Sequence, residues 1–147
     1  MKYLLLVSHG DFSIGLKQTL SMFAGDDALK SVIAVGLKPG EAAATFNTRF
    51  EALMRTLPET ASFVVLADIV GGSPLTTVCN VLNDHGKLAN ALILGGMNFP
   101  MALAVLMGKG TMSNAALKEK ALSEATGGIK EFQMPTTIYS EDDEDDI

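Results

Sequence analysis

Near its start the chain carries the stretch LLLVSHG at residues 4–10, in which four apolar side chains lead directly into a serine, a histidine and a glycine. An unbroken apolar run that ends in a small polar loop is typical of a strand buried on both faces. Such strands belong to parallel sheets covered by helices, so this stretch predicts an α/β fold. It also places His9 at the carboxyl end of the strand.

Short apolar runs and helical stripes alternate along the rest of the chain. Further strands are expected at residues 31–35, 62–67 and 88–94. Helices are expected at residues 16–23 and 46–57, from Ser73-Pro74 onward, around Pro100, and at 113–124. This alternation predicts a small doubly wound parallel sheet of order 2-1-3-4 flanked by helices, followed by one short strand at residues 129–134.

Length and composition fit one folded domain. The chain has 147 residues, of which 48% are hydrophobic. The last seven residues, EDDEDDI, hold six of the 17 acidic residues, which leaves 11 acids against 11 bases elsewhere. We therefore expect a neutral domain at residues 1–134 and an acidic, disordered tail at residues 135–147.

The same features limit the partners and the compartment. A neutral body without a basic cluster argues against nucleic acid as a partner. No stretch approaches the ~18 apolar residues that span a membrane, and the first apolar run is too short for a secretion signal. We expect a cytoplasmic protein without direct membrane insertion.

Two loops carry side chains suited to chemistry. In a sheet of order 2-1-3-4, ligands bind where the strand order reverses, at the carboxyl ends of strands one and three. The loops leaving these strands contain His9 and Asp68, which are far apart in sequence. The topology predicts that they are neighbours.

This pair suits phosphoryl transfer. A neutral imidazole offers one nitrogen lone pair, and a carboxylate on the other nitrogen fixes the tautomer and stabilises the charged ring. Asp68 is the candidate orienting residue. The glycines and the helix start in Gly71-Gly72-Ser73 would bind phosphate oxygens, and Gly10 with the helix after it would add donors. Alternatively, His9 is structural or merely exposed, Asp68 caps a turn, and Ser73 is an N-cap in either case.

The remaining candidates have structural explanations. His85 falls at a helix end, and Cys79 falls on a buried helical stripe. Two histidines and one cysteine without ligand spacing predict no metal site. The nucleotide-binding glycine motifs and the serine-esterase motif are missing from the sequence, so we expect no cofactor.

Three motifs together resemble a known family. They are Val7-Ser8-His9-Gly10, Asp68-x-x-Gly71-Gly72-Ser73-Pro74 and Gly96-Met97-Asn98-Phe99-Pro100-Met101. In this order, over residues 3–132, the chain closely resembles the IIA component of the mannose/fructose/sorbose family of the bacterial phosphoenolpyruvate-dependent sugar phosphotransferase system (PTS).

The resemblance implies a phosphotransferase that relays phosphate between proteins. His9 would accept phosphate from the carrier HPr as tele-phosphohistidine and pass it to a IIB component, which phosphorylates sugar as the membrane IIC and IID components import it. Asp68 matches the orienting aspartate and Ser73 the loop serine. The resemblance also implies a homodimer in which an antiparallel last strand, near residues 128–132, is exchanged. IIB would be a separate polypeptide.

Three other functions are compatible with parts of this sequence. The phosphotransfer subunit that serves dihydroxyacetone kinase shares the histidine chemistry, but residues 71–74 and 98–100 favour sugar transport. A histidine-dependent phosphatase usually needs an arginine beside the histidine, whereas the arginines here are Arg49 and Arg55, on the second predicted helix. A non-catalytic regulatory module would leave the pairing of His9 with Asp68 a coincidence.

Overall fold

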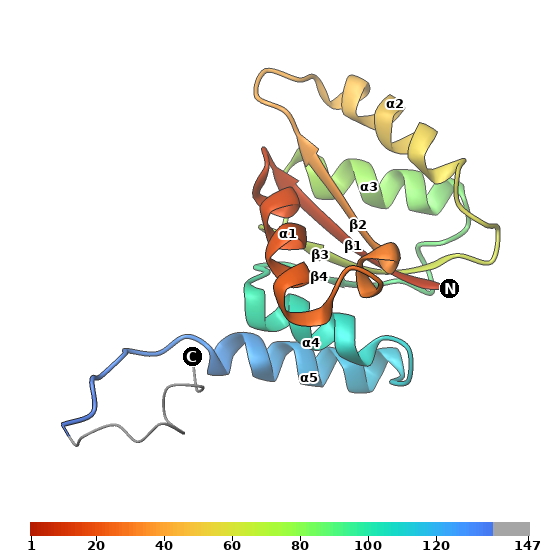
Figure 1. Cartoon of the computed structure of the whole chain (residues 1–147). Coiled ribbons are helices and arrows are strands. Elements are labelled where there is room, and N and C mark those ends of the chain that lie inside the picture. Colours follow the sequence, from red (N-terminus) through yellow and green to blue (C-terminus); the bar gives the residue numbers. More distant parts are fainter. Residues whose placement is uncertain (137–147) are drawn as a thin grey trace.

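Four parallel strands form the centre of the molecule in the order β2-β1-β3-β4 (Figure 1). The computed structural model describes residues 1–136, so most of the predicted tail lies outside the described residues. The strands are β1 (Lys2–His9), β2 (Val32–Leu37), β3 (Ser62–Ala67) and β4 (Leu92–Leu94). All three strand pairs are parallel, which confirms the predicted sheet.

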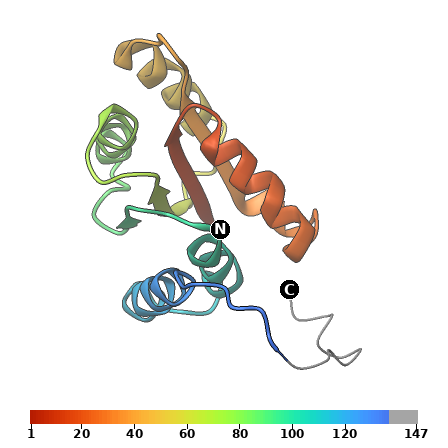
Figure 2. The same cartoon turned by 90° about the vertical axis from the view of Figure 1, so that its left-hand side faces the viewer.

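Helices cover both faces of this sheet. They are α1 (Phe12–Ala24), α2 (Ala43–Met54), α3 (Ser73–Asp84), α4 (Phe99–Gly108) and α5 (Asn114–Gly127), with a short 3-10 turn, η1, at Ala28–Ser31. Figures 1 and 2 show α2 and α3 on one side of the sheet, and α4 and α5 on the other. The helix α1 packs on the same side as α4.

The first strand joins the two halves of the core. Leu4, Leu5, Leu6 and Val7 are all completely buried. Leu4 and Leu6 pack with α1, α4 and α5, whereas Leu5 and Val7 pack with α2 and α3. Successive side chains of a strand point to opposite faces, which is why this apolar run requires helices on both sides.

Two predicted boundaries were wrong. The strand predicted at residues 88–94 is only Leu92–Leu94, because the chain turns before it and the Ala91 N–H bonds the Leu88 carbonyl at 3.1 Å. Ser73 is the first residue of α3 and not its N-cap, because Gly72 holds that position with a φ of 82°. A positive φ of this kind suits glycine and not serine.

The last predicted strand is not formed within this chain. Residues 129–134 have no regular structure, and Figures 1 and 2 show them extending away from the sheet. The side chains of Ile129 and Phe132 are 76% and 80% exposed. Among residues 1–136, no helix has the length and apolar character that crossing a membrane requires.

Candidate functional site

Adjacent strands bring the two predicted loops together. β1 and β3 pair in register up to Val7 and Ala67, and the Asp68 N–H donates to the Val7 carbonyl at 3.1 Å. His9 lies two residues beyond Val7 and is the last residue of β1. The topology therefore makes His9 and Asp68 neighbours, although 59 positions separate them in sequence.

One oxygen of the Asp68 carboxylate binds two nitrogen atoms of His9. Its Oδ2 accepts the His9 backbone N–H at 2.9 Å and lies 2.9 Å from Nδ1 of the ring. Its Oδ1 accepts the Ile69 N–H at 2.9 Å. A carboxylate only accepts hydrogen bonds, so this geometry assigns the ring proton to Nδ1 and leaves the lone pair on Nε2.

Asp68 is held in its charged form. Partial burial acts to raise the pKa of Asp68, but hydrogen bonds from the His9 backbone, the His9 ring and the Ile69 N–H together lower it below its usual value. The carboxylate is therefore ionised at neutral pH. The His9 side chain is 48% exposed, so another protein can reach the ring.

Gly72 lies beside the Nε2 edge of the His9 ring. Gly71 and Gly72 have φ angles of 83° and 82°. A Cβ added to Gly72 would lie 3.3 Å from His9 Cε1 and 3.6 Å from Nε2, so only a glycine lets the backbone come this close. Ser73 then begins α3, whose first N–H groups have no partner within the helix. Gly71, Gly72 and Ser73 thus present a helix start beside Nε2, which is a favourable place for an anion.

Gly10 has a different role from the one predicted. Its φ is 55°, and its N–H donates to the Leu37 carbonyl at 2.7 Å. This amide is therefore engaged with β2. Gly10 supplies the sharp turn after His9 and not a free donor for phosphate.

Two buried serines, Ser8 and Ser13, also hold the turn after His9, and neither was predicted as a site residue. Ser8 and Ser13 are completely buried. The Ser13 N–H donates to Ser8 Oγ at 2.8 Å, and Ser13 Oγ donates to the Val35 carbonyl at 2.9 Å. A signal was present, because Ser13 lies three residues before Leu16 on the apolar stripe of α1. A polar residue on a buried stripe needs a hydrogen-bond partner.

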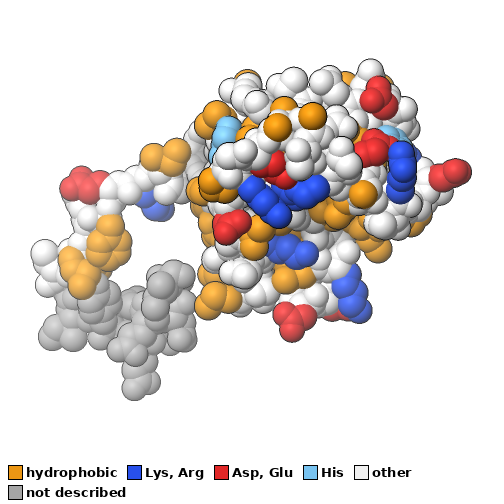
Figure 3. Space-filling view, turned by 90° about the horizontal axis from the view of Figure 1, so that it is seen from above, with side chains coloured by type: hydrophobic (Ala, Val, Ile, Leu, Met, Phe, Trp, Pro, Cys, Tyr) orange, Lys and Arg blue, Asp and Glu red, His pale blue; other side chains and the backbone are white. Residues whose placement is uncertain are grey.

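Exposed apolar side chains surround His9. Phe12 and Ile69 are 55% and 51% exposed, and Val70 is 82% exposed. Figure 3 shows hydrophobic side chains on the surface beside a histidine, on the side from which the C-terminal segment leaves. Clustered apolar surface of this kind commonly marks a protein-docking site.

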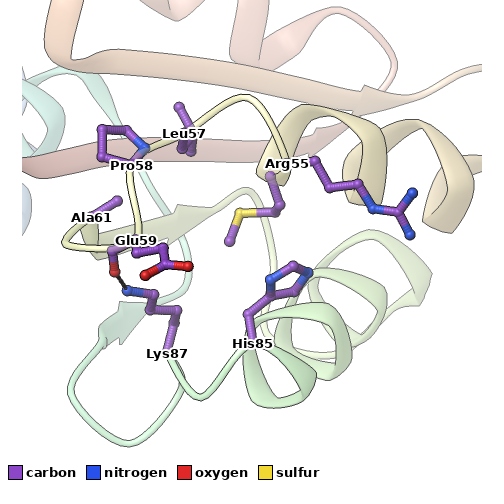
Figure 4. A pocket seen from close by; sticks show the side chains of 8 residues that line it. Arg55, Leu57, Pro58, Glu59, Ala61, His85 and Lys87 are labelled. Atoms are coloured by element: carbon purple, nitrogen blue, oxygen red, sulfur yellow. Dashed lines mark hydrogen bonds between the residues drawn. The ribbon is translucent and has the colours of Figure 1, made fainter.

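A cavity of about 480 Å³ lies away from this site. It is next to Ala61, directly before β3, and therefore at the opposite end of the parallel sheet from His9. Figure 4 shows that Lys87, on its wall, donates to the Glu59 backbone carbonyl. His85, also on the wall, has its Nε2 2.7 Å from Glu51 Oε1, which agrees with the structural role predicted for it.

Other candidate groups add no second site. Cys79 is partly buried on α3, and burial raises the pKa of its thiol. Within residues 1–136, no three His, Cys, Asp or Glu side chains are grouped so that they could hold a metal ion.

Comparisons with known proteins agree with one another. The family model EIIA-man, described as PTS system fructose IIA component, matches residues 3–122. The PTS system fructose-specific EIIA component of Bacillus subtilis is 29% identical over 102 residues, or 69% of this chain. The match spans 66% of that relative, slightly less than two thirds of its length.

Solved structures share the fold. The PTS IIA protein associated with the fucose utilization operon of Streptococcus pneumoniae has a TM-score of 0.72 and 27% identity, over 88% of this chain and 92% of that one. The mannose/sorbose specific IIA subunit of Enterococcus faecalis has a TM-score of 0.76 and 18% identity, over 94% and 100%. The sheet order and the helices around it are therefore those of this group of structures.

Proposed function

Because the chain belongs to the EIIA-man family of PTS fructose IIA components, we propose that it is a phosphoryl carrier of a sugar phosphotransferase system. In this proposal, His9 accepts phosphate from phospho-HPr and passes it to a IIB component. IIB then phosphorylates sugar that the membrane IIC and IID components import. This function places the chain in the cytoplasm, associated with the membrane only through these partners.

The chemistry follows from the two nitrogens of His9. The Nε2 lone pair attacks phosphorus, an Nε2–P bond forms, and the bond from phosphorus to the donor breaks. The product is tele-phosphohistidine. Asp68 keeps the proton on Nδ1 and stabilises the positive charge that the ring gains. Transfer to IIB reverses these steps, with the IIB acceptor atom attacking the same phosphorus.

The glycine loop provides the place for the phosphate oxygens. Phosphoryl transfer depends mainly on positioning and on neutralising oxygen charge. Gly72 lies next to the edge of the ring that carries Nε2, and Ser73 begins α3 directly after it. We assign Gly71, Gly72 and Ser73 to this cradle, together with the positive end of the α3 dipole.

A phosphatase is less well supported. Arg49 bonds Glu41 and the Gly36 carbonyl, and Arg55 lies 3.5 Å from Glu51. Each arginine is thus engaged on α2 or beside it, and neither makes a bond to the His9 loop that could clamp a phosphate for hydrolysis. The positions of the two arginines therefore favour a carrier over a phosphatase.

We further propose that the chain is a homodimer that exchanges residues 128–132. Ile129 and Phe132 are exposed apolar residues on a segment without partners in the sheet of its own chain. β4 is a short edge strand, and an unpaired edge accepts a further strand readily. The proposal for residues 1–134 as the IIA domain rests on the same family membership.

The observation that carries the proposal is the 2.9 Å contact between Nδ1 and Asp68 Oδ2 in a His9 side chain that is 48% exposed. The test is to incubate the chain with phosphoenolpyruvate and the general phosphorylating proteins, and to measure an acid-labile, alkali-stable adduct. The wild type and His85→Ala should be labelled, whereas His9→Ala should not. Labelling of His9→Ala at the wild-type level would refute the role of His9. Adding a IIB protein or a dihydroxyacetone kinase subunit then identifies the acceptor.

A further inference from the structure

We infer that Arg49 and Glu41 are positioning residues that hold the His9 loop in its reactive geometry. The effect on phosphoryl transfer rests on the function proposed above. The effect on the His9 ring itself does not, and can be measured separately. Neither residue bonds the ring, and both act on it through contacts with β2 and the His9 loop.

Glu41 and Arg49 form an ion pair with two hydrogen bonds. Glu41 Oε2 lies 2.7 Å from Arg49 Nε, and Glu41 Oε1 lies 2.7 Å from Arg49 Nη2. The Glu41 side chain is only 7% exposed. Glu41 Oε1 also accepts the Lys38 N–H at 3.1 Å. A two-bond arginine–carboxylate pair has a defined orientation, unlike a mobile surface pair.

This ion pair is bonded to the end of β2. Arg49 Nη2 donates to the Gly36 carbonyl at 2.8 Å, while the guanidinium lies 5.3 Å from the centre of the Phe46 ring. Arg49 therefore fixes Gly36 from α2, and Glu41 fixes Lys38 two residues later. Together they hold both sides of Leu37, the last residue of β2.

The end of β2 is in turn bonded to the His9 loop. The Leu37 carbonyl accepts the Gly10 N–H at 2.7 Å. A Cβ added to Gly36 would lie 1.9 Å from the Gly10 carbonyl oxygen, so the two backbones are in direct contact. Gly10 therefore bonds Leu37 through its N–H, and its carbonyl packs against Gly36, the residue before Leu37 in β2. It follows His9 directly, and a shift of β2 moves His9 relative to Asp68.

A lysine at position 49 would break this arrangement while keeping the charge. The guanidinium supplies Nε to one oxygen of Glu41, and Nη2 to the other oxygen and to Gly36. An ammonium group is a compact charge without this planar fork. Arg49→Lys thus removes the fixed geometry and keeps the electrostatics nearly constant.

The test compares Arg49→Lys with Arg55→Lys. Arg55 is on the same side of the molecule at the end of α2, is 75% exposed, and makes one 3.5 Å contact with Glu51. The first readout is the ¹⁵N chemical shifts of the His9 ring across a pH titration, which report the tautomer and the ring pKa. The second readout is the steady-state rate of phosphorylation by phospho-HPr, resolved into kcat and KM.

We expect Arg49→Lys to shift the His9 ring signals toward a mixture of tautomers. It should also lower kcat about tenfold with little change in KM, since misplaced reacting groups cost up to about 100-fold. Arg55→Lys should change neither readout. Glu41→Gln is the second variant, for the case that Arg49→Lys does not fold, and it should act in the same direction.

Unchanged His9 signals in folded Arg49→Lys or Glu41→Gln would overturn the inference. Equal changes in Arg49→Lys and Arg55→Lys would also overturn it, because they would reflect a general effect of altering α2. If phospho-HPr does not label the wild type, the proposed function fails. The ring signals of His9 would still decide whether Arg49 positions the loop.

Discussion

Asp68 Oδ2 is shared between two groups of one residue, because it lies 2.9 Å from His9 Nδ1 and also accepts the His9 backbone N–H at 2.9 Å. The carboxylate therefore fixes the main chain and the ring of His9 together. A rotation of the ring away from Asp68 would lose the Nδ1 contact, which keeps Nε2 facing the glycine loop.

This sharing predicts the effect of Asp68→Asn. Asparagine lacks the negative charge that stabilises the ring on attack, and in either orientation its NH2 group opposes a backbone N–H that Asp68 accepts, from His9 or from Ile69. We expect phosphorylation by phospho-HPr to slow by about 10- to 100-fold, as for other groups that orient a reactive histidine. Initial rates measure the loss, and circular dichroism checks that the fold is retained. A rate equal to wild type would remove Asp68 from the mechanism.

Gly72→Ala should separate backbone strain from contact with the ring. Gly72 has a φ of 82° and a ψ of 159°, a region that is essentially restricted to glycine, so alanine there should lower the free energy of unfolding by roughly 1–3 kcal/mol. The new methyl group would also lie 3.3 Å from His9 Cε1 and displace the ring. Phosphorylation should therefore slow markedly. The rate is measured with the same phospho-HPr assay.

The matched control is Gly86→Ala. Gly86 has a φ of 70°, and nothing lies within 4 Å of an added Cβ. It should also lose stability in urea unfolding, because its φ is positive, while keeping the wild-type phosphorylation rate. If both variants lose activity equally, strain alone explains the result and the contact of Gly72 with the ring is unimportant.

The sequence predicted those parts of the site that follow from the order of the strands. The apolar run at residues 4–7 indicated a sheet buried on both faces, and the strand order then placed His9 beside Asp68. Arg49 could not be placed in this way. Its bond to the Gly36 carbonyl depends on where α2 packs across the end of β2, and no local pattern encodes that distance.

Two wrong predictions, the N-cap of α3 and the start of β4, have similar causes. Ser73 has the residue type of an N-cap, but the backbone of Gly72 at positive φ takes that position. Residues 88–91 are apolar enough for a strand, yet the turn after α3 uses them to bring the chain back to the sheet. In both cases a tertiary requirement outweighed a local preference.

Glu41 should make stability depend on pH in acid. The hydrogen bond from Arg49 is the main cause that lowers the pKa of Glu41 to about 2, from a usual value of 4.5. A lowered pKa stabilises the folded state above pH 4.5, and this contribution is lost as the pH falls toward 2. Urea unfolding at several pH values should show a smaller loss over this window for Glu41→Gln than for wild type. Parallel curves would contradict the assignment.

Val70 should contribute to docking and not to chemistry. It is 82% exposed in the loop that carries Asp68, and apolar interface residues typically add affinity through buried area. Val70→Ser should raise the KM for phospho-HPr about threefold to tenfold and leave kcat near wild type. Met107→Ser, at a 69% exposed position on α4, is the control and should change neither constant. A change confined to kcat would place Val70 in the chemical step.

Ser13→Ala tests how firmly the turn after His9 is held. The Ser13 hydroxyl donates to the Val35 carbonyl at 2.9 Å in a completely buried environment, so its loss leaves that carbonyl without this donor. We expect a loss of about 1–3 kcal/mol in the free energy of unfolding, measured in urea at pH 7. Ser21→Ala is the comparison on the same helix, because the Ser21 hydroxyl bonds the Gln18 carbonyl at the surface. Its loss should stay within about 0.5 kcal/mol. Equal losses would mean that the Ser13 hydroxyl is not an anchor of the His9 turn.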